Sequence, residues 1–161
     1  MHLDKNIKNV RKEKYKLLVL LFFVLNSSFF YGQLNTNISA QKKSADSLLL
    51  LSKQQVKIGD FKKAFEYVEN SITIFKTLRD NKSTGNCYNQ MATISYYKGE
   101  YDKALISFKS SKFYFEKANY VEGVASATNN IGAIYYLLGN LPKAIDSYKK
   151  ALHFHEELNN E

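Results

Sequence analysis

The chain has 161 residues, of which 45% are apolar, which is enough for one domain of modest size with a hydrophobic core. One proline and no tryptophan favour helices and argue against a loop-rich fold. Half of the formal charge of +8 lies in residues 1–32 and the other lysines are scattered among acids, which argues against a nucleic-acid-binding stripe.

Residues 1–32 have the order of a secretory signal peptide. A basic stretch ending at Lys16 precedes the apolar run 17–25, and polar residues 26–28 follow. This apolar run is much shorter than the roughly 20 residues that span a bilayer. We expect cleavage after Gly32 and export to a periplasmic or other extracytoplasmic location. The alternatives are an uncleaved membrane anchor through residues 17–31 and a buried helix of a soluble protein.

One sequence unit recurs three times behind this leader. Residues 33–43 are short and polar and are interpreted as a linker, and the helical period begins at Ser44. Glycines at 59, 99 and 139 and alanines at 64, 104 and 144 keep the same spacing. A fixed period of about 40 residues is typical of stacked-repeat proteins. The units are 44–82, 83–122 and 123–161, which together form one solenoid domain, 44–161.

Each unit is predicted to hold two helices separated by its glycine. Apolar and small residues recur at three- and four-residue spacings, as in Ala104, Phe108, Ser111 and Phe115. Small residues at fixed positions of the second helix, such as Ala104 and Ser111, would let the two helices approach closely. We expect longer loops between units, around 80–85 and 118–123.

The helix starts carry their own signal. The residue after each glycine, which is Asp60, Glu100 or Asn140, can accept hydrogen bonds from the free N–H groups of a helix start. Pro142 falls in the first turn of its helix, where its missing N–H costs little.

This pattern resembles the tetratricopeptide repeat family, which pairs two helices per unit with small and aromatic residues at set positions. The family's usual period is about 34 residues, so the longer period here resembles the long variant of kinesin light chains and of bacterial sensory and regulatory proteins. The resemblance implies an all-α, right-handed α-solenoid of three helix-turn-helix repeats. The matching residues are Ser52, Ala64, Val68 and Ser71 in the first unit, Ala92, Ala104, Phe108 and Ser111 in the second, and Gly132, Tyr135, Ala144, Tyr148 and Ala151 in the third.

The last helix lacks a polar capping helix after it in this sequence. Tyr148, Leu152 and His155 are therefore expected to have no following neighbour, although stacked repeats normally finish on a polar outer face. We expect either that the chain is the front of a longer protein or that this open end pairs with another molecule, including a second copy.

Catalytic and metal-binding patterns do not stand out. His153 and His155 are two residues apart and would point to different sides of a helix. Cys87 is the single cysteine, sits in a helical pattern and is interpreted as a small buried hydrophobe. We expect no enzyme activity, no cofactor and no metal.

Aligned amides are the one feature that suggests binding. Asn89-Gln90 recurs one period later as Asn129-Asn130, and asparagine can both donate to and accept from a peptide backbone. Asparagines at the matching place contact peptide in kinesin light chains, so the resemblance implies a peptide-binding face on the first helices. The alternative is that one asparagine per repeat bonds the backbone of the neighbouring repeat. The candidate peptide-binding residues are Asn86, Asn89, Thr93, Tyr96, Asn129, Asn130 and Tyr136.

Two functional hypotheses follow. The first is an exported, non-enzymatic domain that binds a peptide or protein segment, as the sensory front of a bacterial histidine kinase or transcriptional regulator. The second is a stand-alone adaptor or scaffold in the cell envelope.

Overall fold

The structure is a computed structural model that describes residues 14, 16 and 33–159. The prediction of a signal segment in residues 1–32 therefore lies outside the described residues, apart from Lys14 and Lys16. The chain divides into two compact units, Met1–Ala40 and Gln41–Glu161. Residues 33–40 of the first unit are helical, as are residues 41–43, so the stretch expected as a linker contains no irregular backbone. None of the described helices is both long and apolar enough to cross a membrane.

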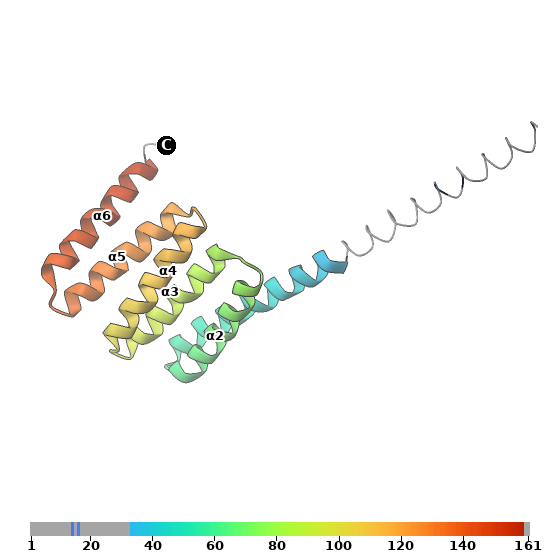
Figure 1. Cartoon of the computed structure of the whole chain (residues 1–161). Coiled ribbons are helices and arrows are strands. Elements are labelled where there is room, and N and C mark those ends of the chain that lie inside the picture. The colour runs from blue at the N-terminus through green and yellow to red at the C-terminus, as the bar shows by residue number, and fades with distance from the viewer. Residues whose placement is uncertain (1–13, 15, 17–32, 160–161) are drawn as a thin grey trace, which may run out of the picture. The chain divides into compact units, whose positions relative to one another are not determined.

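The second unit is a stack of antiparallel helices joined by short turns (Figure 1). Residues 41–57 are helical and pair with α2, α3 pairs with α4, and α5 pairs with α6, so helices pack in consecutive pairs and the predicted all-α solenoid is confirmed. The described residues contain no β-strand. The helix bounds are α2 (Phe61–Thr77), α3 (Asn81–Tyr97), α4 (Tyr101–Lys117), α5 (Val121–Leu137) and α6 (Leu141–Asn159).

The length of the period arises from helix length. Helices α2 to α5 have 17 residues each, and a short turn separates each from the next, so one helix and one turn make half of a period. The longer loops expected around 80–85 and 118–123 are wrong, because α3 already begins at Asn81 and α5 at Val121. Gly85 and Gly123 lie inside these helices, where their missing side chains make room for a neighbouring ring.

Every turn holds one residue in the left-handed backbone region. Gly59, Gly99 and Gly139 have φ of 81°, 74° and 75°, a conformation that glycine adopts at little steric cost. The turns between units have the same geometry at Arg79 and Asn119, with φ of 55° and 50°. A left-handed turn residue therefore occurs twice in each period. It is a glycine in the turns within units and another residue in the turns between units.

The residue after each left-handed position starts the next helix. Asp60 accepts a hydrogen bond from the backbone N–H of Lys63 at 3.1 Å, and Asn140 accepts one from Lys143 at 3.3 Å, which confirms both predicted caps. Glu100 makes no such bond, so its prediction is wrong; its carboxylate instead pairs with Lys98 and Lys103 at 2.7 and 3.0 Å. A longer glutamate side chain reaches lysines more readily than it folds back on its own helix.

Small residues hold the two helices of a unit together, as expected from their spacing. Ala64 and Ala104 are fully buried. The Ser71 hydroxyl donates to the backbone carbonyl of Ala45 at 2.8 Å, and the Ser111 hydroxyl repeats this bond to Gly85 at 2.9 Å. These buried bonds connect the second helix of a unit to the first, and each satisfies a hydroxyl that would otherwise be costly to bury.

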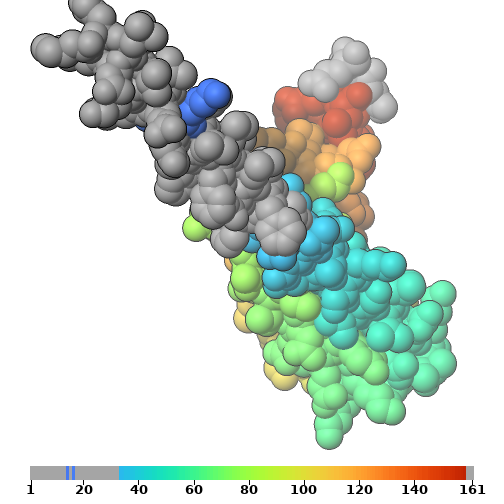
Figure 2. Space-filling model, turned by 90° about the vertical axis from the view of Figure 1, so that its right-hand side faces the viewer, coloured from blue at the N-terminus to red at the C-terminus, as the bar shows by residue number. Residues whose placement is uncertain are grey.

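Larger side chains fill the space between units. Val68 and Phe75 of α2 share a buried cluster with Cys87 and Ile94 of α3. Phe108 of α4 shares a second cluster with Ile131 and Ile134 of α5. In the space-filling view, residues 41–57 and α2, coloured cyan to green, adjoin one another at the surface (Figure 2).

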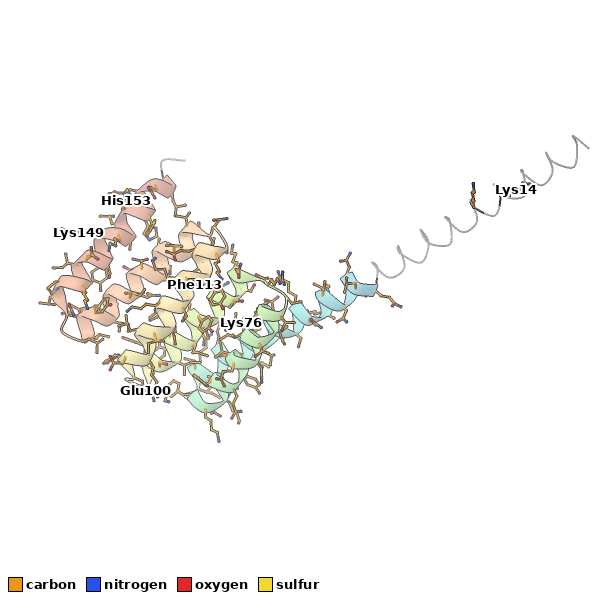
Figure 3. The ribbon with its side chains drawn as sticks, viewed as in Figure 1. Lys14, Lys76, Glu100, Phe113, Lys149 and His153 are labelled. Atoms are coloured by element: carbon orange, nitrogen blue, oxygen red, sulfur yellow. The ribbon has the colours of Figure 1, made fainter. Side chains whose placement is uncertain are left out.

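A second contact between units is aromatic and cationic. Lys76 of α2 donates to the Tyr88 hydroxyl of α3 at 2.8 Å, which raises the pKa of Lys76 (labelled in Figure 3). Tyr88 in turn stacks on Tyr114 of α4 with ring centroids 5.4 Å apart. One lysine therefore connects three consecutive helices at the surface.

Candidate functional site

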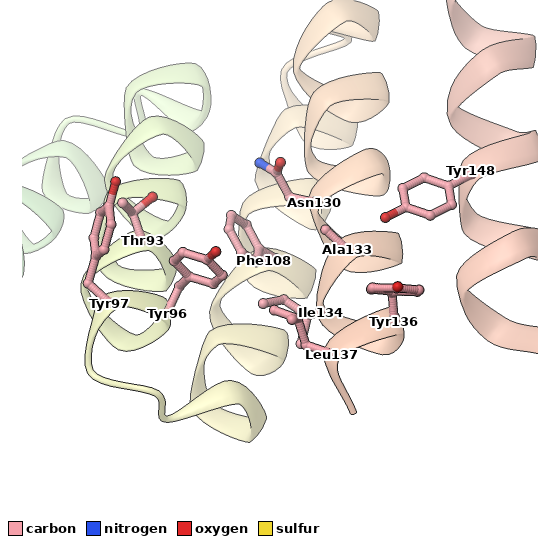
Figure 4. Close-up of a pocket in the computed structure, with 10 residues that line it drawn as sticks. All are labelled: Thr93, Tyr96, Tyr97, Phe108, Asn130, Ala133, Ile134, Tyr136, Leu137 and Tyr148. Atoms are coloured by element: carbon pink, nitrogen blue, oxygen red, sulfur yellow. The ribbon is translucent and has the colours of Figure 1, made fainter. Parts of the chain in front are cut away.

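A pocket of about 380 Å³ opens between α3 and α5 (Figure 4). Helices α3 and α5 supply most of its lining, one residue of α4 lies between them, and one residue comes from α6. The lining residues are Thr93, Tyr96, Tyr97, Phe108, Asn130, Ala133, Ile134, Tyr136, Leu137 and Tyr148.

Aromatic contacts hold the α3 side of the pocket in place. Tyr97 stacks on Phe61 of α2, with ring centroids 6.4 Å apart and an interplanar angle of 12°. Tyr96 meets Tyr97 edge to face at 5.4 Å and lies 6.1 Å from the ring of Tyr101. Phe108 is almost fully buried and forms part of the core between α4 and α5. The aromatic side of the pocket is therefore in contact with α2 through Phe61 and with the core between α4 and α5 through Phe108.

An amide pair connects the two helices that form the pocket. The Asn130 side-chain N–H on α5 donates to the Asn89 side-chain oxygen on α3 at 3.2 Å. The Thr93 hydroxyl donates to the backbone carbonyl of Asn89 at 2.9 Å. An asparagine amide has two N–H groups and an oxygen with two lone pairs, so this single bond leaves each amide able to bond a ligand as well.

Four of the seven candidate residues line the pocket: Thr93, Tyr96, Asn130 and Tyr136. Asn89 is outside the lining but is held at Asn130 by their hydrogen bond. Their contact with peptide stays a prediction.

Asn86 and Asn129 are exposed and outside the lining. Asn129 is the repeat counterpart of Asn89, yet the residue that reaches Asn89 is Asn130. Consecutive side chains of a helix point in directions about 100° apart around the helix axis. Asn130 therefore points toward α3, whereas Asn129 points into solvent. The bond from Asn130 to Asn89 joins two side chains, whereas the alternative expected from the sequence is an asparagine bonded to the backbone of the neighbouring repeat.

Sequence reasoning missed six lining residues. They are Tyr97, Phe108, Ala133, Ile134, Leu137 and Tyr148. Tyr97 and Leu137 lie one period apart and are 59% and 42% exposed, so large apolar residues recur in solvent at the end of two first helices. That recurrence is visible in the sequence, but the pattern alone does not separate an exposed ring from a buried one.

The lining residues carry no formal charge, so the pocket favours uncharged groups. Cys87 lies elsewhere, in the core between α2 and α3, where burial raises the pKa of its thiol to about 11. The thiol stays protonated at neutral pH, which supports its interpretation as a small buried hydrophobe. Among the described residues, no group of three or more His, Cys, Asp or Glu side chains is placed to hold a metal ion.

Comparisons with known proteins agree with this architecture. The tetratricopeptide repeat (TPR) family model matches residues 125–157, which cover most of α5 and α6. No curated protein sequence matches the chain. The likeness to the long-period variant of the family stays a prediction.

Solved structures share the fold at low sequence identity. The TPR domain of Arabidopsis FLU has a TM-score of 0.67 at 19% identity, over 73% of this chain and 98% of that one. BtubC (BKLC) from P. vanneervenii has a TM-score of 0.69 at 18% identity, over 80% and 56%. The N-terminal domain of stress-induced protein-1 from C. elegans has a TM-score of 0.63 at 16% identity, over 71% and 87%. The chain therefore has the fold of tetratricopeptide repeat domains, and its third unit matches the sequence model of that family.

Proposed function

We propose that the chain is a protein-interaction domain that binds an extended peptide segment in the pocket between α3 and α5. The observation that carries the proposal is an uncharged, aromatic pocket with an amide pair at Asn89 and Asn130. Apolar lining with a few polar groups is the usual composition of a ligand site.

The geometry suits a peptide in two ways. A pocket of about 380 Å³ can take a bulky uncharged side chain. The free N–H and oxygen of the amide pair can bond the peptide backbone beside it, whatever the neighbouring side chains are. Because the lining residues sit on packed helices, little ordering cost falls on the protein when it binds.

The test begins with a library of random short peptides selected on the full chain, followed by titration of synthetic peptides by fluorescence anisotropy. Ala133→Trp fills the pocket, and Asn89→Ala and Asn130→Ala remove the amide pair. Asn70→Ala, on an exposed position of α2 outside the pocket, is the matched control.

We expect Ala133→Trp to abolish binding, each amide variant to weaken it about tenfold, and the control to leave it unchanged. Circular dichroism should show unchanged helicity in every variant. Peptides that bind Ala133→Trp as tightly as the wild type would contradict the proposal. A lower melting temperature in the amide variants with unaltered affinity would assign Asn89 and Asn130 a structural role only.

We also propose that the domain is exported and forms the sensory front of a bacterial signalling protein, with an envelope adaptor as the alternative. The support is the basic, apolar and polar order of residues 1–32. An immunoblot of fractionated cells with antibody to residues 44–158 tests both. A small species in the soluble envelope fraction favours the adaptor, a much larger membrane-bound band favours the sensor, and a cytoplasmic band contradicts export.

A further inference from the structure

Helix α6 presents a row of apolar side chains to solvent. The α6 face, as we define it, consists of Leu141, Ile145, Tyr148 and Leu152, with Ile145 55% and Leu152 59% exposed. In the first unit, Val68 and Ile72, the counterparts of Tyr148 and Leu152, are buried, whereas Phe65, the counterpart of Ile145, is 37% exposed. Phe108, the counterpart of Tyr148, is in a cluster with Ile131 of α5.

The first described helix of the stack presents the other half of the same contact. Leu51 is the counterpart of Met91 and Ile131, which pack against α2 and α4 respectively. Leu51 itself is 37% exposed, and Ile58, directly after the helix, is 74% exposed. We define the 41–57 face as Leu48, Leu51 and Gln55 together with Ile58. It corresponds to the side that α3 and α5 turn toward the preceding unit.

The charges at the two ends are complementary. In each step between units, the C-terminal end of one helix leads through a short turn to the N-terminal end of the next, so these ends are neighbours. At the corresponding ends of the two open faces, α6 carries Glu156 and Glu157, and the first helix carries Lys43. A helix docked on α6 in the same way as α5 on α4 would bring Lys43, the counterpart of Gly123, to the end of α6 that carries His155, Glu156 and Glu157, because Gly123 lies against Phe115, the counterpart of His155.

We propose that a second copy of this chain covers the α6 face, with its 41–57 face as the contact. The packing of α2 with α3 and of α4 with α5 would then continue from one molecule to the next. Such a head-to-tail contact uses two different surfaces, so every docked molecule leaves one of each free. The contact builds open chains that lengthen as the protein concentration rises. It goes beyond peptide binding in the pocket between α3 and α5, whose lining shares only Tyr148 with the α6 face.

The test uses the full chain and sedimentation velocity over a range of concentrations. Leu152→Glu places a charge in the α6 face, and Leu51→Glu places one in the 41–57 face. Ile106→Glu, at a position of α4 that is 65% exposed and belongs to neither face, is the matched control. Circular dichroism checks folding, and Ile145→Glu replaces Leu152→Glu if the latter unfolds.

We expect the wild type and the control to grow in mass with concentration. Each face variant alone should stay monomeric, because a buried unpaired charge weakens the contact by about tenfold or more. An equimolar mixture of Leu152→Glu and Leu51→Glu should form dimers and nothing larger, since one intact copy of each face remains in the mixture.

Other occupants predict other results. A symmetric α6–α6 contact would leave Leu51→Glu dimeric and would overturn the head-to-tail proposal. A wild type that stays monomeric at every concentration would also overturn it and would leave the α6 face to a different protein or to further chain. Association that neither substitution alters would place the contact outside both faces and would equally overturn it.

Discussion

Helices α4 and α6 occupy the same position in successive units, yet their surroundings differ. Phe108 of α4 is 6% exposed, whereas its counterpart Tyr148 of α6 is 38% exposed. Phe115 of α4 is buried, whereas the matching position of α6 is the exposed His155. α5 covers α4, and no described helix covers the outer side of α6. The comparison shows that the neighbouring helix sets the burial of a side chain, because the helical pattern itself is the same.

The largest expected contrast lies in the core. Phe108→Ala should lower the free energy of unfolding by about 3 kcal/mol or more, because it leaves a cavity between α4 and α5. Tyr148→Ala should cost less than half as much, since water already reaches that ring. Urea unfolding followed by circular dichroism measures both. Equal losses would show that α6 is as well packed as α4.

Two helical glycines extend the contrast. A Cβ on Gly85 would lie 2.6 Å from the buried ring of Phe115, and one on Gly132 would lie 3.0 Å from the ring of Tyr148. We expect Gly85→Ala to destabilise the fold by about 1–2 kcal/mol, because the ring of Phe115 has no room to move. Gly132→Ala should be close to neutral, since Tyr148 can move outward and alanine favours the helix by about 1 kcal/mol. Thermal melts of both variants test this, and a stabilised Gly85→Ala would contradict it.

A third contrast compares helix starts by their pH dependence. Burial opposes ionisation of Asp80, but hydrogen bonds from Lys42 and Ser83 outweigh it and hold the pKa below its usual 3.8. A lowered pKa stabilises the fold at neutral pH, and this contribution disappears as the pH falls through the folded-state pKa. Asp80→Asn keeps a capping oxygen but does not titrate. We therefore expect the wild type to exceed Asp80→Asn in stability by about 1 kcal/mol or less at pH 7.

This difference should vanish as the pH falls below the folded-state pKa of Asp80. Glu100→Gln is the comparison variant at a helix start whose carboxylate pairs with Lys98 and Lys103 but makes no capping bond. Urea unfolding across the pH range measures both pairs, and a difference for Asp80→Asn that grows in acid would contradict the assignment.

The smallest expected effect concerns the turns between units. Arg79 and Asn119 both adopt a left-handed conformation, which asparagine tolerates better than arginine. Arg79→Gly should raise the melting temperature slightly, by an amount equivalent to about 0.5 kcal/mol, whereas Asn119→Gly should leave it unchanged. A lower melting temperature for Arg79→Gly would mean that the arginine side chain contributes contacts that outweigh its strain.

The repeat could be predicted in outline, but the turns between units could not. Gly59, Gly99 and Gly139 mark three turns openly. Arg79 and Asn119 adopt the same left-handed backbone conformation without being glycines. The sequence therefore does not mark the turns between units, and it predicts loops where α3 and α5 begin. The helical spacing of Ala104, Phe108 and Ser111 was sufficient for the second helices, because local periodicity survives in any packing arrangement.

The candidate site was predictable only in part. Tyr96, Asn130 and Tyr136 came from aligning one repeat on the next, Thr93 came from its place near the asparagines, and all four line the pocket. The choice of Asn130 over Asn129 as the partner of Asn89 depends on the rotation of α5 against α3. That rotation is set by contacts between residues a full repeat apart in the chain, which no local pattern records.

The sequence by itself determined the helices, their recurrence at a fixed period and the solenoid class, because these follow from local periodicity and from repetition of one unit. Only the tertiary structure decided which side chains face the pocket, which lie in the core and which remain on the open face of α6. Those outcomes depend on what lies beside each helix. The same position is therefore core in α4 and surface in α6.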